Sequence, residues 1–507
     1  MKLRLGFLKY NALFFLLYAL TTDAGAQNLE DRVVQHTLEN GMTFLLMERH
    51  QAPVFTGMIV VKAGSVDEDA GKTGLAHMLE HMFFKGTKVL GTRNYKAEER
   101  ILEKMDHIGA QLSEELRKGE LVDEERVRAL RQQLESLRAQ AAEYQVKDEI
   151  GALYSRHGAA RLNATTGRDL TRYFVSLPSN RLELWAAIES DRMANPVFRE
   201  FYSERDVVME ERRLRVETDP SGALREAFFA TAFIAHPYRR PIIGWMPDIA
   251  SLTTNDAREF FREYCVPSNA VAAIVGDIEV EETIGVIERY FGRLPTRERS
   301  PRHITGEPTQ SGERRVTIVR DAEPELLIGY HKPTLPHPDD YVFDVIDSVL
   351  SRGRTSRLYA KLVKELKLAT DVSTWQGAPG ARYENLFVIE ATPRNPHSAA
   401  EVETALYEEI ERLKTERVSE RDLQKVRNQI RADFVRALDS NFGLASQLAY
   451  FQAIAGDWKY MLRLLREIDK VSAEDVQRVA SKYLVRENST MATIVRRASR
   501  AAAEGER

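Results

Sequence analysis

The sequence repeats itself over a distance of about 220 residues, and this duplication limits the folds that the chain can adopt. Tyr264 and Tyr483 lie 219 positions apart, and so do Asn269 and Asn488. In each copy, an amphipathic helical pattern with N-terminal capping residues is followed by a turn and then by an apolar run typical of a buried strand. The matched offset predicts an internal duplication.

The duplication favours an α+β protein with two homologous α/β-sandwich repeats, each a mixed sheet with helices packed on it. About 480 residues follow the N-terminal segment discussed next, which is too many for one hydrophobic core. Residues 292–314 are rich in Pro, Arg, Thr and Gly and lack apolar periodicity, so we expect a linker there. The first repeat would then span 27–291 and the second 315–507.

Residues 1–26 have the organisation of a secretory signal peptide. Basic residues precede an apolar run over 12–20, and Ala24-Gly-Ala26 is a typical cleavage site. This run and every later one are shorter than the roughly 20 apolar residues that a membrane span needs. The only cysteine, Cys265, excludes an intramolecular disulfide. We therefore expect an exported protein without a membrane span, located in a bacterial periplasm.

Charged residues of both signs are mixed along the chain. The sequence has 72 Lys and Arg against 76 Asp and Glu, which gives a formal net charge of −4. A nucleic-acid-binding protein carries a strongly basic patch instead, so no nucleic-acid partner is expected. The mixed pattern fits an ordinary solvated surface.

The segment His77-Met-Leu-Glu80-His81 lies in an apolar stretch that favours a helix. Two histidines four positions apart share one helix face, so both imidazoles can reach one metal ion. Glu80 lies on the same face and can reach a water molecule on that ion. This order of residues is typical of zinc hydrolases with an inverted H-E-x-x-H motif. The alternative is a solvated helix face whose histidines bind nothing, because a catalytic zinc site needs a third protein ligand.

Residues 112–150 differ in character from their surroundings and predict an inserted helical hairpin. Gly119 could form its turn, and Asp123 is a candidate N-cap for the second arm. Apolar residues recur there at spacings of three and four, with charged and amide residues between them, which is a heptad pattern. The seam consists of Val127, Leu130, Leu134, Leu137, Ala141 and Tyr144. Such a hairpin either packs on itself at the surface or serves as a docking arm for a partner.

Short apolar and alternating patterns predict the remaining elements near the motif. The dipeptide Asn40-Gly41 indicates a type I′ hairpin turn. Strands are expected over 56–61, 161–166 and 171–176, and a helix over 182–193.

A second acidic cluster lies in a predicted long helix that begins near Tyr202. Glu204 and Glu211 are seven positions apart and share a face, whereas Glu210 points elsewhere. A charged helix of this kind is most often a solvated face, and by itself it indicates no function.

Together, the His77-x-x-Glu80-His81 motif and the E-R-x-V-V-x-E-E segment around Glu204 and Glu211 resemble the pitrilysin (insulinase) family of zinc metallopeptidases, which includes the mitochondrial processing peptidase. The similarity extends over nearly the whole mature chain. The resemblance implies that His77, His81 and Glu211 bind one Zn²⁺, that Glu80 is the catalytic base and that Glu204 supports the site. His81 and Glu211 are farther apart than is usual in the family, and the inserted hairpin accounts for the excess.

The resemblance also implies a substrate and a reaction. Substrate would add as an extended strand beside Asn163, Ala164 and Thr165, a mode that selects peptides by shape more than by sequence. The expected activity is that of a zinc endopeptidase, which hydrolyses peptides or unfolded protein segments inside a clam-like chamber.

One departure from the family concerns the second repeat. Where the active site is complete in one chain, that repeat supplies an Arg and, seven positions later, a Tyr, but Val363 and Thr370 stand there in this sequence. The resemblance therefore implies a heterodimer with a zinc-free sister chain, with a homodimer as second choice. The competing function is a non-catalytic structural or chaperone-like subunit. A third possible function is a metal-scavenging binder. Such a protein needs no general base, so the presence of Glu80 argues against it.

Overall fold

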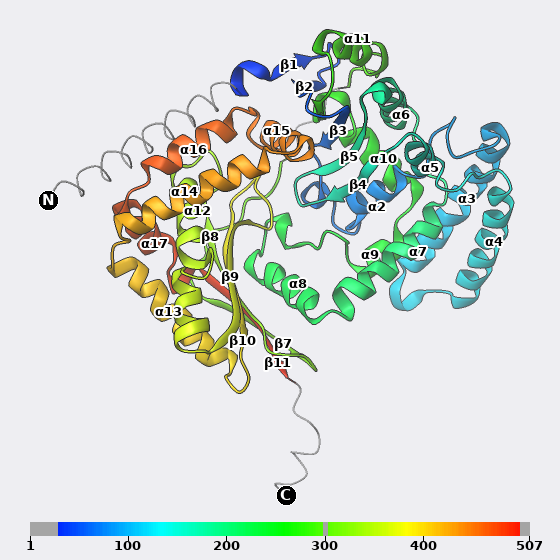
Figure 1. Ribbon diagram of the computed structural model, residues 1–507. Helices are drawn as coiled ribbons and strands as arrows, with labels where there is room; N and C mark the ends of the chain where they lie inside the picture. The colour runs from blue at the N-terminus through cyan, green and yellow to red at the C-terminus, as the bar shows by residue number, and fades with distance from the viewer. Residues whose placement is uncertain (1–28, 298–302, 497–507) are drawn as a thin grey trace, which may run out of the picture.

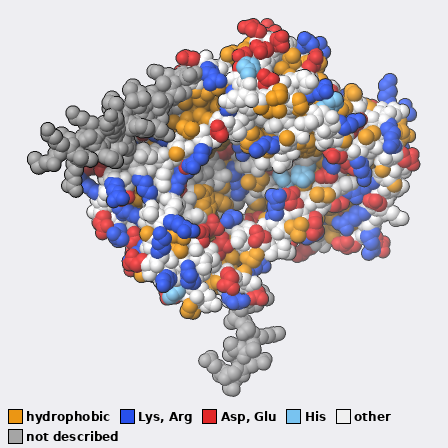
Figure 2. Space-filling model, in the orientation of Figure 1, with side chains coloured by type: hydrophobic (Ala, Val, Ile, Leu, Met, Phe, Trp, Pro, Cys, Tyr) orange, Lys and Arg blue, Asp and Glu red, His pale blue; other side chains and the backbone are white. Residues whose placement is uncertain are grey.

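The structure of the protein is a computed structural model that describes residues 29–297 and 303–496. The expected signal peptide lies outside the described residues. Each repeat contains one sheet, and the two repeats lie side by side (Figure 1). The space-filling view shows a face that is hollowed between them (Figure 2).

The first sheet has six strands in the order β1-β2-β6-β3-β5-β4. Only β2 and β6 pair in parallel, and β4 forms one edge. Every residue of β6 is buried, because it lies in the middle of the sheet. The strands are β1 Val34–Thr37, β2 Thr43–Glu48, β3 Val54–Val61, β4 Ala160–Thr166, β5 Thr171–Pro178 and β6 Ala270–Gly276.

The second sheet repeats this topology without a counterpart of β1. Its order is β7-β11-β8-β10-β9, and β7 and β11 form its parallel pair. The strands are β7 Arg314–Arg320, β8 Leu326–Lys332, β9 Ala369–Ala378, β10 Asn385–Pro393 and β11 Ser489–Arg496. The shared strand order confirms the expected fold class of two α/β repeats.

The two copies also match in their local hydrogen bonds. A capping box begins α10 (Thr254–Tyr264), and another begins α17 (Ala473–Tyr483). The amide of Asn269 donates to the carbonyl of Tyr264 at 2.9 Å, and that of Asn488 donates to the carbonyl of Tyr483 at 2.8 Å. Each asparagine thereby closes the turn from helix to strand.

Helices cover both sheets. In the first repeat they are α2 Leu75–Met82, α3 Tyr95–Leu116, α4 Glu124–Ala142, α5 Glu149–Arg156, α6 Leu182–Ala194, α7 Phe201–Arg212, α8 Pro220–Ala232, α9 Met246–Ser251, α10 and α11 Val280–Tyr290. In the second they are α12 Pro338–Ser351, α13 Ala399–Thr415, α14 Glu420–Ala437, α15 Asn441–Ala455, α16 Tyr460–Lys470 and α17. None of the helices in the described part of the chain is long and apolar enough to cross a membrane.

Each repeat lends one helix to the sheet of the other. Helix α8 of the first repeat packs on β7 and β11, and α15 of the second repeat packs on β3 and β6. One hydrophobic core therefore contains Met58 and Val271 of the first sheet together with Leu444 and Leu448 of α15. The repeats are joined by this shared core as well as by the chain between them.

The inserted hairpin is present, but its first arm is longer than expected. Helix α3 begins at Tyr95 rather than near Leu112, because the side chain of Asn94 caps it by accepting the N–H of Ala97. The second arm begins as predicted, with the Asp123 side chain as its N-cap. Four seam residues are buried against α3, namely Val127, Leu130, Leu134 and Ala141.

The expected type I′ turn at Asn40-Gly41 is wrong. Such a turn needs positive φ at both central residues, but only Gly41 has one, at +86°. Leu38 N–H donates to Met42 O at 3.0 Å, so the loop is longer than two residues. The Asn40 amide is instead used to bind the carbonyl of Phe291 at 2.8 Å.

Candidate active site

Helix α2 carries three of the predicted site residues and has a fixed start. Gly74, at φ +88°, precedes the helix, and a Cβ there would lie 2.2 Å from the carbonyl oxygen of Ile243. The carboxylate of Glu68 accepts the N–H groups of Gly74 and Ala76 at 2.9 and 2.8 Å. Burial raises the pKa of Glu68 to about 8. These contacts set the position of the helix.

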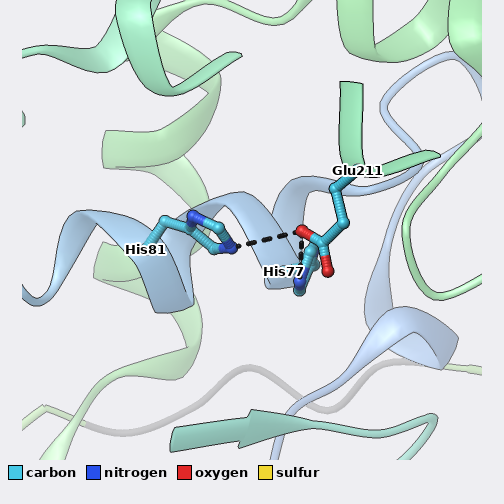
Figure 3. Close-up of side chains that lie close together, drawn as sticks. All are labelled: His77, His81 and Glu211. Atoms are coloured by element: carbon cyan, nitrogen blue, oxygen red, sulfur yellow. Dashed lines mark ion pairs between the residues drawn. The ribbon is translucent and has the colours of Figure 1, made fainter. Parts of the chain in front are cut away.

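The structure brings the three expected metal ligands together (Figure 3). His77 Nε2 and His81 Nε2 of α2 each lie 3.7 Å from Glu211 Oε2 of α7. Ligands about 2.0–2.1 Å from a tetrahedral zinc ion lie roughly 3.3 Å apart, so the spacing fits such an ion. It is the only group of this kind in the described part of the chain.

The electrostatics of the ligands also suit a metal. Burial lowers the pKa of His77 to about 3, so its imidazole is neutral at pH 7, which is the form that binds metal ions. Arg215 Nη2 lies 3.0 Å from Glu211 Oε1. This ion pair leaves the other carboxylate oxygen facing the imidazoles.

Glu80 lies beside the ligands on α2, and its Oε2 accepts a hydrogen bond from Thr166 Oγ1 of β4 at 2.5 Å. Burial raises the pKa of Glu80, although the bond from Thr166 opposes this effect. A partly buried carboxylate with a raised pKa suits a general base.

Glu204 supports the second histidine. His81 Nδ1 donates to Glu204 Oε2 at 3.2 Å, and Lys85 pairs with the other carboxylate oxygen. Burial opposes ionisation of Glu204, but the hydrogen bonds from His81 and Lys85 outweigh it and hold its pKa below the ordinary value. A carboxylate that orients a metal-binding histidine in this way is common in zinc sites. Sequence analysis missed Lys85, because a lysine just after a helix normally indicates only a solvated end.

The candidate site opens into a cavity of about 690 Å³. Asn163, Ala164 and Thr165 line it from β4, whose outer edge has no partner strand in the described chain. All the lining residues belong to the first repeat; sequence analysis missed Arg168, Arg215, Val216, Arg225, Phe229 and Ile243 among them. Val363 is buried within the second repeat and Thr370 is exposed on β9, and neither lines the cavity.

Two profiles of known protein families together match most of this chain. A profile described as insulinase (peptidase family M16) matches residues 43–118 and 133–245, and one described as peptidase M16 inactive domain matches 251–430. The chain belongs to the insulinase (M16) family of peptidases. This confirms the resemblance drawn from the His77 motif and the Glu211 segment.

Individual similar proteins match more than nine tenths of this chain. Zinc protease PqqE of Helicobacter pylori is 28% identical over 482 residues, which are 94% of this chain and 95% of that protein. The crystal structure of a protease from Helicobacter pylori has a TM-score of 0.77 at 25% identity and covers 91% of this chain and 99% of that one. An M16 inactive domain from Pseudomonas fluorescens shares the fold, with a TM-score of 0.73 at 14% identity over 92% of this chain and 99% of that one. The names of the related proteases indicate zinc as the metal.

Proposed function

We propose that this protein is a zinc-dependent endopeptidase, with His77, His81 and Glu211 as the ligands of one Zn²⁺. The observation that carries the proposal is the meeting of these three donors, 3.7 Å from the carboxylate oxygen to each imidazole, beside Glu80 and an open strand edge. Zinc supplies Lewis acidity, which polarises the scissile carbonyl and makes water nucleophilic at neutral pH.

The protein's own groups perform the proton transfers. Glu80 takes a proton from the attacking water and gives it to the leaving amine nitrogen. Thr166 orients the Glu80 carboxylate, and Glu204 holds the His81 ring through Nδ1. These roles are assigned by position and by the resemblance to the family.

The substrate is a peptide or an unfolded protein segment in an extended conformation. Its backbone would pair with the free edge of β4 along Asn163, Ala164 and Thr165. The cavity beside this edge contains both Glu80 and the ligands, which supports a scissile bond placed there. The hollow between the repeats would be the chamber that holds the chain (Figure 2).

A second candidate function is a non-catalytic structural or chaperone-like subunit. It is favoured by the match of residues 251–430 to a domain described as inactive. We place it second, because the first repeat retains the base as well as the ligands, and a structural subunit has no need of either.

We further propose that the protein is exported to the periplasm and acts with a partner chain. The cavity lacks any contribution from the second repeat among the described residues, and Val363 and Thr370 replace the expected Arg and Tyr. A zinc-free sister chain that supplies those two side chains would complete the site. A homodimer is the second choice.

The test is cleavage of a quenched-fluorescent library of unstructured peptides by the chain from residue 27 onward. It is run with and without a co-encoded sister chain, and before and after chelation. We expect chelator-sensitive cleavage that needs the sister. Cleavage by the chain alone would keep the peptidase but remove the heterodimer, and no cleavage by a zinc-loaded mixture would favour the non-catalytic subunit.

Two variants and one control separate the proposed roles. Glu80→Gln should keep zinc and lose hydrolysis. Full activity in that variant would refute the assignment of Glu80 as the general base. Glu211→Ala should lose zinc, whereas Glu210→Ala should keep it, because Glu210 points away from the site and pairs with Arg213 at 2.8 Å. Zinc content is measured by atomic absorption of the purified proteins.

A further inference from the structure

Thr166 connects the proposed base to the turn between β4 and β5. Its hydroxyl donates to Glu80 Oε2, and this is the only hydrogen bond that the Glu80 carboxylate makes within the described chain. Thr166 is the last residue of β4. A contact that fixes the following turn, residues 167–170, therefore also fixes the position of the Thr166 hydroxyl relative to the Glu80 carboxylate.

The first repeat holds one side of this turn. The backbone N–H groups of Ser65 and Val66 donate to the carbonyl oxygens of Gly167 and Arg168 at 3.2 and 2.9 Å. Both donors lie in the short 3-10 helix Ser65–Asp67, which precedes α2. The turn thus has a fixed position relative to the start of the helix that carries Glu80.

The second repeat holds the other side. Asp169 is 5% exposed, and its Oδ2 accepts the N–H groups of Ala381 and Arg382 at 2.7 and 3.1 Å. Both donors lie in the turn between β9 and β10. The guanidinium of Arg382 also donates to the carbonyl of Asp169 and, at 3.0 Å, to that of Lys62.

A buried ion pair strengthens this contact. Arg382 Nη1 lies 3.2 Å from Asp67 Oδ2, and the Asp67 side chain is fully buried. A Cβ on Gly380 would lie 2.5 Å from Asp169 Oδ2, so the lack of a side chain at Gly380 leaves room for this carboxylate. Buried carboxylates need such partners, and the second repeat supplies some of those of both Asp67 and Asp169.

We infer that the repeat without the metal motif positions the catalytic base of the other repeat. Arg382 and Asp169 hold the turn 167–170, and the turn holds Thr166, which orients Glu80. The two turns that meet occupy equivalent places in the duplicated topology, after β4 and after β9. Arg382, Asp169 and Thr166 are positioning residues, and the inference rests on the proposed peptidase function.

The first experiment tests Thr166 by steady-state kinetics on one cleaved peptide. Thr166→Val should lower kcat about 10- to 100-fold, because a displaced base loses its alignment with the reacting water. KM and zinc content should stay unchanged, and Thr166→Ser should restore most of kcat. Thr56→Val is the matched control. It removes a hydroxyl hydrogen bond of the same sheet, 2.8 Å between Thr56 and Ser176, that does not involve Glu80.

The second experiment tests the contact from the second repeat. Arg382→Met should lower kcat by a similar factor at unchanged zinc content, and Arg382→Lys should recover part of the loss. The double variant with Thr166→Val should be no slower than the slower single variant, because both changes act through Glu80. Arg49→Met is the matched control, since Arg49 joins the repeats elsewhere, through the carbonyls of Leu438 and Asp439.

The outcomes separate this inference from the proposed function. Wild-type kcat in folded Arg382→Met, or losses that multiply with those of Thr166→Val, would overturn the inference alone. If Arg382→Met does not fold, Asp169→Asn weakens the same contact while keeping the side-chain shape, and Tyr238→Phe is its control, because the Tyr238 hydroxyl of the first repeat donates to Asp169 Oδ1 at 2.7 Å. Cleavage that persists both after chelation and in the Glu80→Gln variant would overturn the proposed function itself.

Discussion

Glu204 and Glu200 lie one helical turn apart and both contact Lys85, but only Glu204 also binds His81. We expect Glu204→Gln to weaken zinc binding about 10- to 100-fold, because the charged acceptor that orients the His81 ring is lost. Glu200→Gln should have little effect. Competition with a fluorescent chelator measures both affinities, and equal losses in the two variants would contradict the role of Glu204.

His236 predicts a pH dependence of stability. Its Nδ1 accepts the N–H of Tyr238 at 3.1 Å, and burial lowers its pKa to about 4 from 6.5. Between these pH values the unfolded chain binds a proton that the folded chain does not, so stability falls as pH drops from 6.5 and the loss levels off below 4.

A substitution that keeps the acceptor isolates this contribution. His236→Asn should reduce the loss of unfolding free energy between pH 7 and pH 4 by about 2 kcal/mol. Urea unfolding at the two pH values measures it in both proteins. The same loss in wild type and variant would show that His236 is not the group responsible.

At the scale of single residues, the sequence alone predicted that the two histidines and Glu80 share one helix face, because all three lie within about one helical turn of one another. The proposed third ligand was identified only through the family resemblance, since Glu211 is 130 positions after His81. Thr166 and Arg382 gave no signal, because their importance depends on which strands and turns meet in three dimensions.

Among the elements, the inserted hairpin is stabilised by its own seam. Leu134 of α4 is 4% exposed and belongs to the core that α3 and α4 share. Leu134→Ala should lower the free energy of unfolding by about 2–4 kcal/mol, through lost burial and the cavity that remains.

The activity of the hairpin variant should not change. Helix α4 contributes no residue to the cavity beside Glu80, so kcat per folded molecule should equal that of the wild type. Gln133→Ala, at an exposed neighbouring position, is the control for stability. A parallel fall in kcat would mean that the hairpin acts on the site.

Element limits were predictable where local signals decide them. Helix α6 begins at Leu182, as the apolar pattern indicated, and β3 includes all of the expected strand over 56–61. The early start of α3 was missed, because the cap at Asn94 lies far before the heptad seam that revealed the hairpin. The turn at Asn40 was misjudged, because its side chain binds Phe291, which is distant in sequence.

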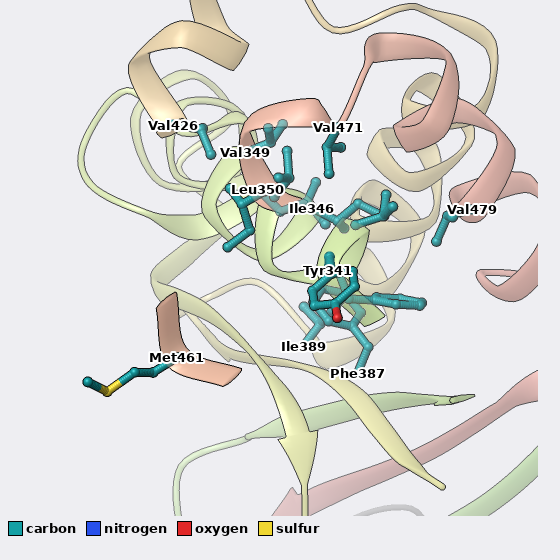
Figure 4. Close-up of a cluster of buried hydrophobic side chains, with 14 of the residues drawn as sticks. Tyr341, Ile346, Val349, Leu350, Phe387, Ile389, Val426, Met461, Val471 and Val479 are labelled. Carbon is teal, nitrogen blue, oxygen red and sulfur yellow. The ribbon is translucent and has the colours of Figure 1, made fainter. Parts of the chain in front are cut away.

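At the scale of the molecule, the duplication could be predicted, but the exchange of helices could not. Matched sequence offsets reveal that two units are alike, and they contain no information on how the units pack. The apolar residues of α15 do not indicate which sheet the helix covers. In the structure α15 packs on the first sheet, although it belongs to the second repeat. Figure 4 shows the centre of the second repeat, where Ile346 of α12 and Phe387 and Ile389 of β10 belong to the same core cluster as α15.

This shared core predicts that the two repeats unfold together. Leu448 of α15 is fully buried in a cluster that also contains Met58 of β3 and Val271 of β6. A single cooperative thermal transition is therefore expected for the intact chain, and Leu448→Ala should shift all of it to lower temperature, at a cost of about 2–5 kcal/mol. Hydrogen exchange resolved by mass spectrometry provides the measurement, since peptides from β6 and from β8 report on different repeats. Because α15 covers β6 and belongs to the core of the second repeat, the peptides from β6 and from β8 should lose protection to the same extent in the variant. Protection that persists in β6 while β8 exchanges would show instead that the repeats are independent domains, with α15 only resting on the first sheet.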